Sequence, residues 1–203
     1  MSHLSGLFIT FEGGERAGKS TQLTAVAERV RGTGRTVTTS REPGGTELGE
    51  RLRSALFAGE SPGPEAELLV FAAARAQLVH EVVRPALADG AVVLCDRFAD
   101  STVAYQQYGR GIDATTIATI NDAATGGLTP ALTVLLDLSP ADAAARGSET
   151  DYMEREASEF HDRVRAGYLT LASADPGRWL VLDATSDIDR LTDAIWERLA
   201  PLL

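Results

Sequence analysis

Short apolar runs alternate with longer segments of helical periodicity along the chain. Runs of four to eight apolar residues favour buried strands, whereas apolar positions three and four residues apart favour helices. The runs predict strands at 7–12, 35–40, 91–95, 132–138 and 179–182. The segments between them predict helices at 19–32, 46–58, 65–88, 140–146, 153–172 and 187–199. This alternation predicts an α/β fold, with a five-stranded parallel sheet as the middle layer of a three-layer α/β/α arrangement.

Glycine and proline mark the breaks between these segments. Gly13-Gly14, Pro43-Gly44-Gly45 and the stretch 59–64 interrupt the pattern, because glycine and proline disfavour regular structure. Pro85 is predicted to end or bend the helix at 65–88. No repeat, linker or low-complexity segment divides the 203 residues. The sequence therefore predicts one domain over residues 1–203, large enough to bury its own core.

The loop after the first predicted strand carries a phosphate-binding pattern. The motif G-x-x-x-x-G-K-[ST] is matched at every fixed position by Gly13-Gly14-Glu15-Arg16-Ala17-Gly18-Lys19-Ser20. The loop lies between a predicted strand and a predicted helix, where backbone N–H groups and a helix N-terminus bind phosphates. Lys19 is the only lysine, and the other 18 basic residues are arginine. Because a compact ammonium reaches between phosphates where a guanidinium is too broad, the pattern indicates a nucleoside triphosphate and favours phosphoryl transfer.

Two oxygen-bearing side chains are predicted to meet beside the phosphates. Ser20 follows the lysine at the start of a helix, and Asp96 ends the third predicted strand, where a Walker-B aspartate stands. Hydroxyl and carboxylate oxygens are the ligands that Mg²⁺ prefers. Ser20 alone also fits a plain helix-start hydroxyl, and Asp96 with Arg97 also fits a surface ion pair. Their place at the strand ends favours a Mg²⁺ site.

Composition narrows the partners and the location. The net charge of -10 argues against general binding to nucleic acid or to an anionic membrane, so anionic substrates require a local arginine cluster. Cys95 is the single cysteine and lies in an apolar run, which predicts a buried thiol. His3, His80 and His161 are scattered and give no zinc spacing. No signal-like or membrane-spanning segment is present, so we expect a cytoplasmic protein.

Arginines and an aromatic ring follow the second predicted strand. Arg41-Glu42-Pro43 opens a turn, and Arg53 lies on the helix after it. Phe71 and Arg75 are four residues apart and share a helix face, although such a pair also fits a core ring with an arginine at its rim. The set supplies guanidinium groups, a stacking ring and an acid, which an acceptor with a phosphate and a base requires.

Taken together, these motifs resemble those of the bacterial thymidylate kinases (dTMP kinases), within the P-loop nucleoside monophosphate kinase group. The resemblance runs in family order from about residue 6 to 185, nearly the whole chain. It is carried by residues 11–21, 41–46, 69–75, 96–106 and 108–111. The phosphate loop is shared by many NTPases, whereas the segments 41–46 and 96–106 together are specific. The resemblance implies a P-loop NTPase fold and transfer of the ATP γ-phosphoryl group to dTMP, in dTTP synthesis.

The resemblance also implies roles for individual residues. Phe71 is expected to stack on thymine and Arg75 to donate to a thymine carbonyl, with Thr102 and Gln106 facing the base edge. Tyr105 is expected to pack under the deoxyribose, and Glu15 is expected near the 3′-hydroxyl. Residues expected near the acceptor phosphate, or in the turn after the second predicted strand that borders it, are Arg41, Glu42, Pro43, Arg53 and Arg97. Residues expected to bind ATP are Gly13, Gly14, Glu15, Arg16, Ala17, Gly18, Lys19, Ser20 and Thr21. The expected catalytic groups are Lys19, Arg16, Asp96 and Arg97, with Mg²⁺ held at Ser20 and Asp96.

The chain departs from many bacterial relatives in the lid, expected at about 146–155. Tyr152 stands where those relatives carry an arginine that points at the transferring phosphate. Arg16 lies inside the phosphate loop instead, an arrangement also known in the family, and we expect it to supply the catalytic charge. Arg146 and Arg155 remain lid candidates for that role. Family members are usually homodimers, which implies a homodimer here.

Two other functions remain open on the sequence. Another nucleotide or deoxynucleoside kinase would share the phosphate loop, but a free nucleoside would not need arginines around an acceptor phosphate. A GTP-dependent switch or binding module would also share the loop. The chain contains no Asn-Lys-x-Asp guanine motif, because its sole lysine is already in the phosphate loop.

Overall fold

A computed structural model describes residues 5–58, 61–147 and 152–203. Within these residues, the strands are β1 (Leu7–Glu12), β2 (Val37–Arg41), β3 (Val92–Asp96), β4 (Leu132–Asp137) and β5 (Trp179–Asp183). They form one five-stranded sheet in the order β2-β3-β1-β4-β5, and every neighbouring pair is parallel. The predicted five-stranded parallel sheet is confirmed. The carboxyl ends of all these strands therefore lie at one edge, where ligands bind in open α/β sheets.

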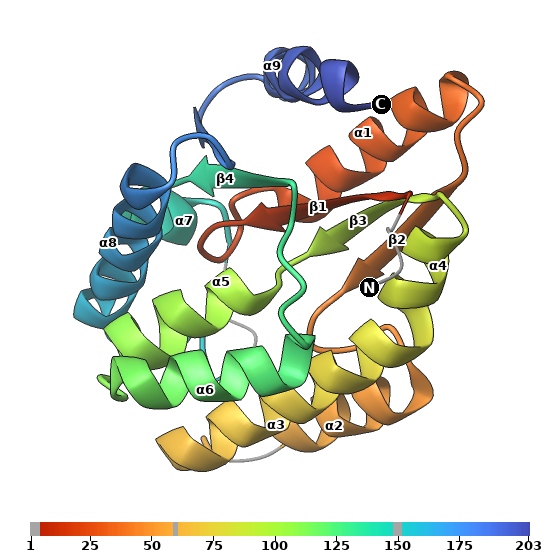
Figure 1. The fold of residues 1–203 in the computed structure, drawn as a ribbon. Coiled ribbons are helices and arrows are strands. Elements are labelled where there is room, and N and C mark those ends of the chain that lie inside the picture. The colour runs from red at the N-terminus through yellow and green to blue at the C-terminus, as the bar shows by residue number, and fades with distance from the viewer. Residues whose placement is uncertain (1–4, 59–60, 148–151) are drawn as a thin grey trace.

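Helices cover both faces of the sheet (Figure 1). The helices are α1 (Lys19–Gly32), α2 (Glu47–Phe57), α3 (Pro64–Leu78), α4 (Arg84–Ala88), α5 (Ala99–Thr102), α6 (Ala114–Thr125), α7 (Pro140–Ala145), α8 (Ser158–Ala174) and α9 (Ile188–Leu199). α1 and α9 lie on one face, while α3, α5, α6 and α8 lie on the other. This arrangement is the three-layer α/β/α fold that the sequence predicts.

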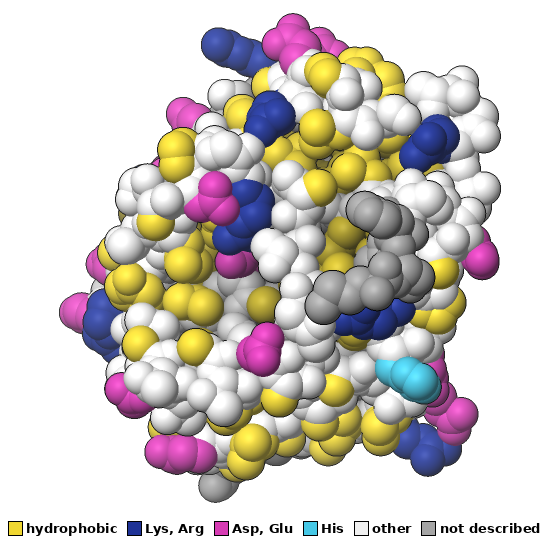
Figure 2. All heavy atoms as spheres, viewed as in Figure 1, with side chains coloured by type: hydrophobic (Ala, Val, Ile, Leu, Met, Phe, Trp, Pro, Cys, Tyr) yellow, Lys and Arg dark blue, Asp and Glu magenta, His cyan; other side chains and the backbone are white. Residues whose placement is uncertain are grey.

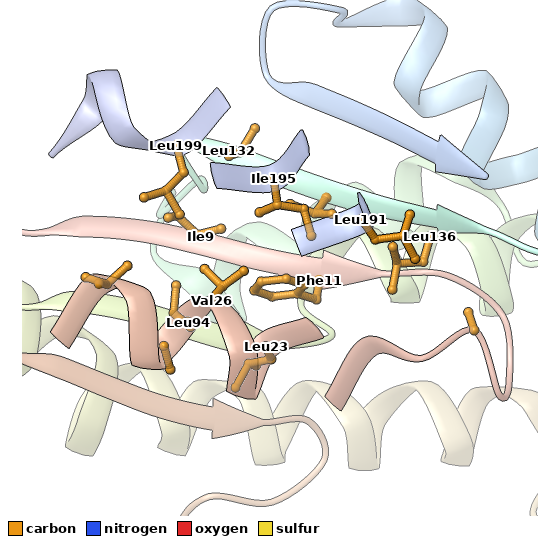
Figure 3. Packing of buried hydrophobic residues seen from close by; sticks show 14 of the residues in the cluster. Ile9, Phe11, Leu23, Val26, Leu94, Leu132, Leu136, Leu191, Ile195 and Leu199 are labelled. Carbon is orange, nitrogen blue, oxygen red and sulfur yellow. The ribbon is translucent and has the colours of Figure 1, made fainter. Parts of the chain in front are cut away.

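Alternation along β1 divides the core between the two faces. Ile9 and Phe11 are fully buried on the side of α1 and α9, while Phe8 packs in a separate cluster on the other side. Figure 3 shows the α1–α9 side, where side chains of both helices meet those of the central strands. Each such buried side chain contributes about 1.5–3 kcal/mol of transfer free energy. Glu12 shares the face of Phe8, because side chains alternate along a strand.

The long helix predicted at 65–88 contains a π-helical stretch. α3 continues through the π-helical residues Val79–Val83 into α4. Pro85 has no N–H and clashes with the carbonyl one turn earlier in a regular helix. Here the Arg84 N–H bonds to the Val79 carbonyl in the wider turn before it. The proline is therefore accommodated by a local change of pitch, and the helix axis continues to Ala88.

The structure corrects two parts of the sequence analysis. The strand at 132–138 was expected to follow a helical stretch, but no bounds were predicted between 96 and 131, where α5, a π-helical stretch at Val103–Gly109 and α6 occupy most of the segment. The helix predicted from Met153 begins at Ser158 instead, because Met153 packs into the core while the next residue, Glu154, bonds to the phosphate loop. Thr46 caps α2, and its side chain accepts from the Gly49 N–H at 2.9 Å.

Some expectations fall on residues outside the description. These residues include His3, part of the loop predicted at 59–64, and residues 148–151 of the expected lid. Cys95 is fully buried, as predicted, and burial raises the pKa of its thiol well above the ordinary value. Within the described ranges, no helix is long and apolar enough to cross a bilayer. Basic and acidic side chains are interspersed over the face drawn in Figure 2.

Candidate active site

The phosphate loop (residues 13–20) joins the end of β1 to the start of α1. Gly13 has φ 139°, and a Cβ there would lie 2.5 Å from the Leu136 carbonyl oxygen, so the position requires glycine. Gly18 precedes α1 with φ 91°. Arg16 adopts φ 57°, a left-handed conformation that few non-glycine residues take. The loop backbone is therefore bent where it would surround phosphates.

Lys19 lies inside the bend of this loop. Its Nζ donates to the carbonyl oxygens of Gly13 at 3.2 Å and Gly14 at 2.7 Å, and the side chain is buried. Burial and the neighbouring Arg97 lower its pKa, while Glu15 and Asp96 oppose that change. The ammonium is held by backbone oxygens at the place where the predicted phosphates would lie.

Ser20 and Asp96 meet beside the loop, as the sequence predicts. The Ser20 hydroxyl donates to Asp96 Oδ2 at 2.7 Å. Both side chains offer hard oxygen atoms, which fit Mg²⁺. The described residues contain no group of three or more His, Cys, Asp or Glu that could hold a metal. A metal here would therefore take its remaining ligands from substrate phosphates and water, as Mg²⁺ commonly does.

Two hollows meet above the strand ends. The donor hollow contains Glu15 to Thr21 of the loop together with Arg41, Glu42, Arg53, Asp96 and Arg97. The acceptor pocket holds about 570 Å³, part of it open to solvent. It is lined by Glu15, Glu42, Pro43, Arg53, Phe57, Phe71, Arg75, Arg97, Ser101, Thr102, Tyr105, Gln106 and Met153. The two hollows share Glu15, Glu42, Arg53 and Arg97.

The acceptor pocket gathers the predicted substrate residues with one exception. Arg41 does not line it but borders the donor hollow, where it pairs with Glu50 at 3.1 Å. The pocket also contains three residues that the sequence analysis did not single out, Phe57, Ser101 and Met153. Their positions depend on packing between distant segments, so no local pattern identifies them.

Arg75 is almost fully buried and bonds to several elements. Its Nε donates to Glu42 at 2.8 Å, and its Nη1 donates to Thr102 at 2.8 Å and to Asn121 at 2.9 Å. Its Nη2 donates to the Phe98 carbonyl oxygen at 3.0 Å. Burial raises the pKa of Glu42, and the charge of Arg75 opposes that rise. Arg75 thus joins the pocket walls, and Asn121 is a partner that the sequence analysis missed.

Arg97, Glu15 and Tyr105 connect the two hollows. Arg97 Nη2 donates to Glu15 Oε1 at 2.5 Å, and the Tyr105 hydroxyl donates to the same oxygen at 2.7 Å. The guanidinium of Arg97 lies 4.9 Å from the centre of the Tyr105 ring. Burial acts to raise the pKa of Glu15, but Arg97, Lys19 and the Tyr105 hydrogen bond lower it to about 2. Glu15 is therefore a carboxylate that orients the groups around it.

Glu12 lies behind this cluster and had no role assigned from the sequence. Its buried carboxylate accepts from the Phe98 N–H at 2.8 Å, from the Ser101 hydroxyl at 2.6 Å and from the Tyr168 hydroxyl at 2.9 Å. Burial and the charge of Asp100 raise its pKa to about 7. Its position at the end of β1 could have indicated a role at the site from the sequence, because ligands bind at strand ends in such sheets.

The far wall of the acceptor pocket is fixed by a second buried acid. The Gln106 amide donates to Glu67 Oε1 at 2.8 Å, and Arg110 donates to Glu67 Oε2 at 3.0 Å. Arg53 donates to the Pro43 carbonyl oxygen at 3.2 Å and lies 5.0 Å from the centre of the Phe57 ring. The rings and guanidinium groups of the pocket are thus held by partners from several helices.

The three arginines considered as the source of the catalytic charge, one in the loop and two in the lid, lie in different surroundings. Arg16 Nη2 donates to Glu154 Oε2 at 2.7 Å. Arg146 donates to the carbonyl oxygens of Arg16 at 3.0 Å and Ala184 at 2.6 Å, whereas Arg155 is exposed. Tyr152, which the sequence analysis expects in place of a lid arginine, is buried. Its ring centre lies 5.6 Å from that of Phe57, so it packs behind a residue that lines the acceptor pocket.

Comparison with known families identifies this combination of loop and pocket. The model of the family "Thymidylate kinase" matches residues 11–195. The chain belongs to the thymidylate kinase family. That match spans the loop, both hollows and the whole of α8, so the parts that form the site all belong to the family pattern.

Individual thymidylate kinases agree with this membership. The chain is 48% identical over 209 residues to a thymidylate kinase of Solidesulfovibrio magneticus, covering 97% of this chain and 100% of the relative. It is 52% identical over 195 residues to one of Deinococcus radiodurans, covering 94% and 95%. The fold is similar to a crystal structure of thymidylate kinase from Ehrlichia chaffeensis, with a TM-score of 0.79, 35% identity and coverage of 96% and 98%.

Proposed function

We propose that the chain transfers the γ-phosphoryl group of ATP to dTMP, with ATP over the phosphate loop and dTMP in the acceptor pocket. Phosphorylation of dTMP in nucleotide synthesis is the activity of the family to which the chain belongs. One observation carries the assignment of the two hollows. They share Glu15, Glu42, Arg53 and Arg97, so a phosphate on an acceptor in one hollow would adjoin the donor phosphates in the other.

The acceptor pocket is proposed to recognise the base and the monophosphate. Phe71 would stack on thymine, while Thr102 and Gln106 would face the base edge. Arg75 would bring its charge to the base from a position fixed by Glu42 and Thr102. Its present bonds mean that it would contribute through electrostatics and by exchanging one partner for a thymine carbonyl.

The sugar and phosphate are proposed to lie between the hollows. Tyr105 would pack under the deoxyribose, and Glu15 would approach the 3′-hydroxyl while it keeps Arg97 in place. Arg53 and Arg97 would bind the acceptor phosphate. Arg41 would contribute only from the donor side, because it pairs with Glu50 outside the acceptor pocket.

The donor side is proposed to stabilise the transferring group. Loop N–H groups from Gly13 to Thr21 would surround the phosphates, with Lys19 neutralising charge between them. Arg16 would supply a guanidinium to the equatorial oxygens. Ser20 and Asp96 would hold Mg²⁺, which neutralises phosphate charge when it is bound.

A homodimer and a cytoplasmic location complete the proposal. Family members usually form homodimers, and ATP and nucleoside monophosphates are available in the cytoplasm. Light scattering during gel filtration tests the dimer, since a mass near twice 21.5 kDa is expected. A mass of one chain would exclude a stable dimer.

A coupled assay of ADP release with a panel of nucleoside monophosphates tests the function. We expect turnover with dTMP and far less with other monophosphates or with thymidine. Equal turnover of thymidine would favour a nucleoside kinase, because that acceptor has no phosphate for Arg53 and Arg97. GTP binding without turnover of any acceptor would favour a switch or binding module.

A further inference from the structure

Glu154 holds the phosphate-loop arginine from a distant part of the chain. Its Oε2 accepts from Arg16 Nη2 at 2.7 Å, and the two side chains are only 12% and 18% exposed. We propose that Glu154 is a positioning residue that orients Arg16 toward the transferring phosphoryl group. The inference rests on the proposed catalytic role of Arg16 and adds the group that sets its direction.

The backbone of Arg16 does not by itself decide where its guanidinium lies. The residue has φ 57° in the phosphate loop. Its side chain lines the donor hollow and also a neighbouring hollow between the loop, α7 and α8. A long flexible side chain between two hollows is oriented by its partners. Glu154 lines the second hollow and not the donor hollow, and it is an acid that pairs with Arg16.

Arg16 can hold Glu154 and contact phosphate at the same time. A guanidinium carries five N–H donors in a rigid fork. One nitrogen can keep the carboxylate while other N–H groups exchange their present partners, such as the Ala143 carbonyl oxygen at 3.4 Å, for phosphate oxygens. The ion pair then fixes the plane of the fork, which decides whether its donors meet the equatorial oxygens.

The segment that carries Glu154 is anchored on the acceptor side. Met153 lines the acceptor pocket, and Arg110 donates to Met153 Sδ at 3.5 Å and to Glu156 at 2.5 Å. Residues on both sides of Glu154 are therefore fixed by one arginine. Because dTMP would fill the pocket that Met153 lines, binding of the acceptor would also restrict the position of Glu154, the next residue in the chain. The position of Arg16 is thus tied to the presence of the acceptor.

Steady-state kinetics of wild type, Glu154→Gln, Arg16→Ala and the double variant test the proposal, with Glu154→Asp and a surface variant as comparisons. Misplacement of a catalytic group costs on the order of 10- to 100-fold, and we expect that loss in kcat for Glu154→Gln, with KM for dTMP unchanged. Glu154→Asp should recover part of the loss because it keeps the charge. In the Arg16→Ala background, Glu154→Gln should have no further effect. Glu159→Gln, on the exposed start of α8, is the matched control.

Each contrary result has its own meaning. Near wild-type kcat in Arg16→Ala would overturn the proposed role of Arg16 and the inference built on it. A large loss in Arg16→Ala with normal kcat in Glu154→Gln would overturn the inference alone. An equal loss from Glu154→Gln with and without Arg16 would also overturn it. A lowered Tm of Glu154→Gln at unchanged kcat would assign the ion pair to stability only.

Discussion

The donor hollow and the acceptor pocket are built in different ways. The donor hollow is mainly one continuous loop, in which backbone groups bend around Lys19. The acceptor pocket is assembled from α2, α3, α5 and the π-helical stretch after α5, together with residues of several loops. Two of its arginines pair with acids, Arg75 with Glu42 and Arg97 with Glu15. A continuous loop is suited to stabilising charge during transfer, whereas an assembled pocket is suited to recognising one acceptor.

This difference separates chemistry from recognition. Changes at Arg16 or Lys19 in the phosphate loop should reduce turnover and leave dTMP binding intact, because neither residue lines the acceptor pocket. Changes in the acceptor pocket should alter dTMP binding or stability, because each residue there is also a structural partner. We therefore expect the catalytic charge to come from the phosphate loop. The acceptor pocket is expected to align dTMP with that charge.

The largest effect is expected at Lys19. Lys19→Ala should nearly abolish turnover, because its ammonium would stabilise the charge that develops on the phosphates. The fold and dTMP affinity should persist, as measured by circular dichroism and calorimetry. Lys19→Arg should also be poor, since a guanidinium does not fit between the carbonyl oxygens of Gly13 and Gly14. Near-normal kcat in Lys19→Arg would contradict the argument from the single lysine.

Arg75 should matter for stability as much as for binding. Arg75→Met leaves the carboxylate of Glu42 buried without its partner, and breaking a buried ion pair costs about 3–5 kcal/mol. Denaturant unfolding measures the loss. The double variant Arg75→Met with Glu42→Gln should regain much of it, because no charge is then left buried. A loss unchanged in the double variant would show that the pair is not the cause.

Phe71 tests recognition with less effect on the fold. Base–aromatic stacking contributes roughly 1–3 kcal/mol, so Phe71→Ala should weaken dTMP binding by a corresponding factor while ATP binding changes little. Calorimetric titration of each substrate separates the two. Equal weakening of both, or of neither, would identify Phe71 as a packing residue only.

The smallest effect concerns Glu12 and pH. Its folded pKa of about 7 exceeds the ordinary value of 4.5, owing to burial and to Asp100. A raised pKa in the folded state gives stability that is present at low pH and lost as pH rises through about 7. The free energy of unfolding of wild type relative to Glu12→Gln should therefore fall between pH 5 and 8, on the order of 2 kcal/mol. A difference that stays constant with pH would contradict the assignment.

The same contrast explains what the sequence could predict. The strands and the glycine-rich loop are local patterns, so the sheet and the place of residues 13–20 between a strand and a helix were predicted correctly. Residues 103–109 form a π-helical stretch, which does not follow the 3.6-residue period on which helix prediction rests. The partners of Arg75 lie 23 to 46 residues away in the sequence. Contacts over such distances are set by packing, so the sequence predicted Arg75 at the site but not how it is held.

The source of the catalytic charge is tested most directly by the kcat of Arg16→Ala, Arg146→Ala and Arg155→Ala at saturating ATP and dTMP. An arginine that stabilises a transferring phosphoryl group is worth on the order of 10³ in kcat, and we expect that loss for Arg16→Ala with dTMP affinity unchanged. Arg146→Ala and Arg155→Ala should each cost far less. A large loss in either of them, with Arg16→Ala near wild type, would place the catalytic charge in the lid and contradict the account.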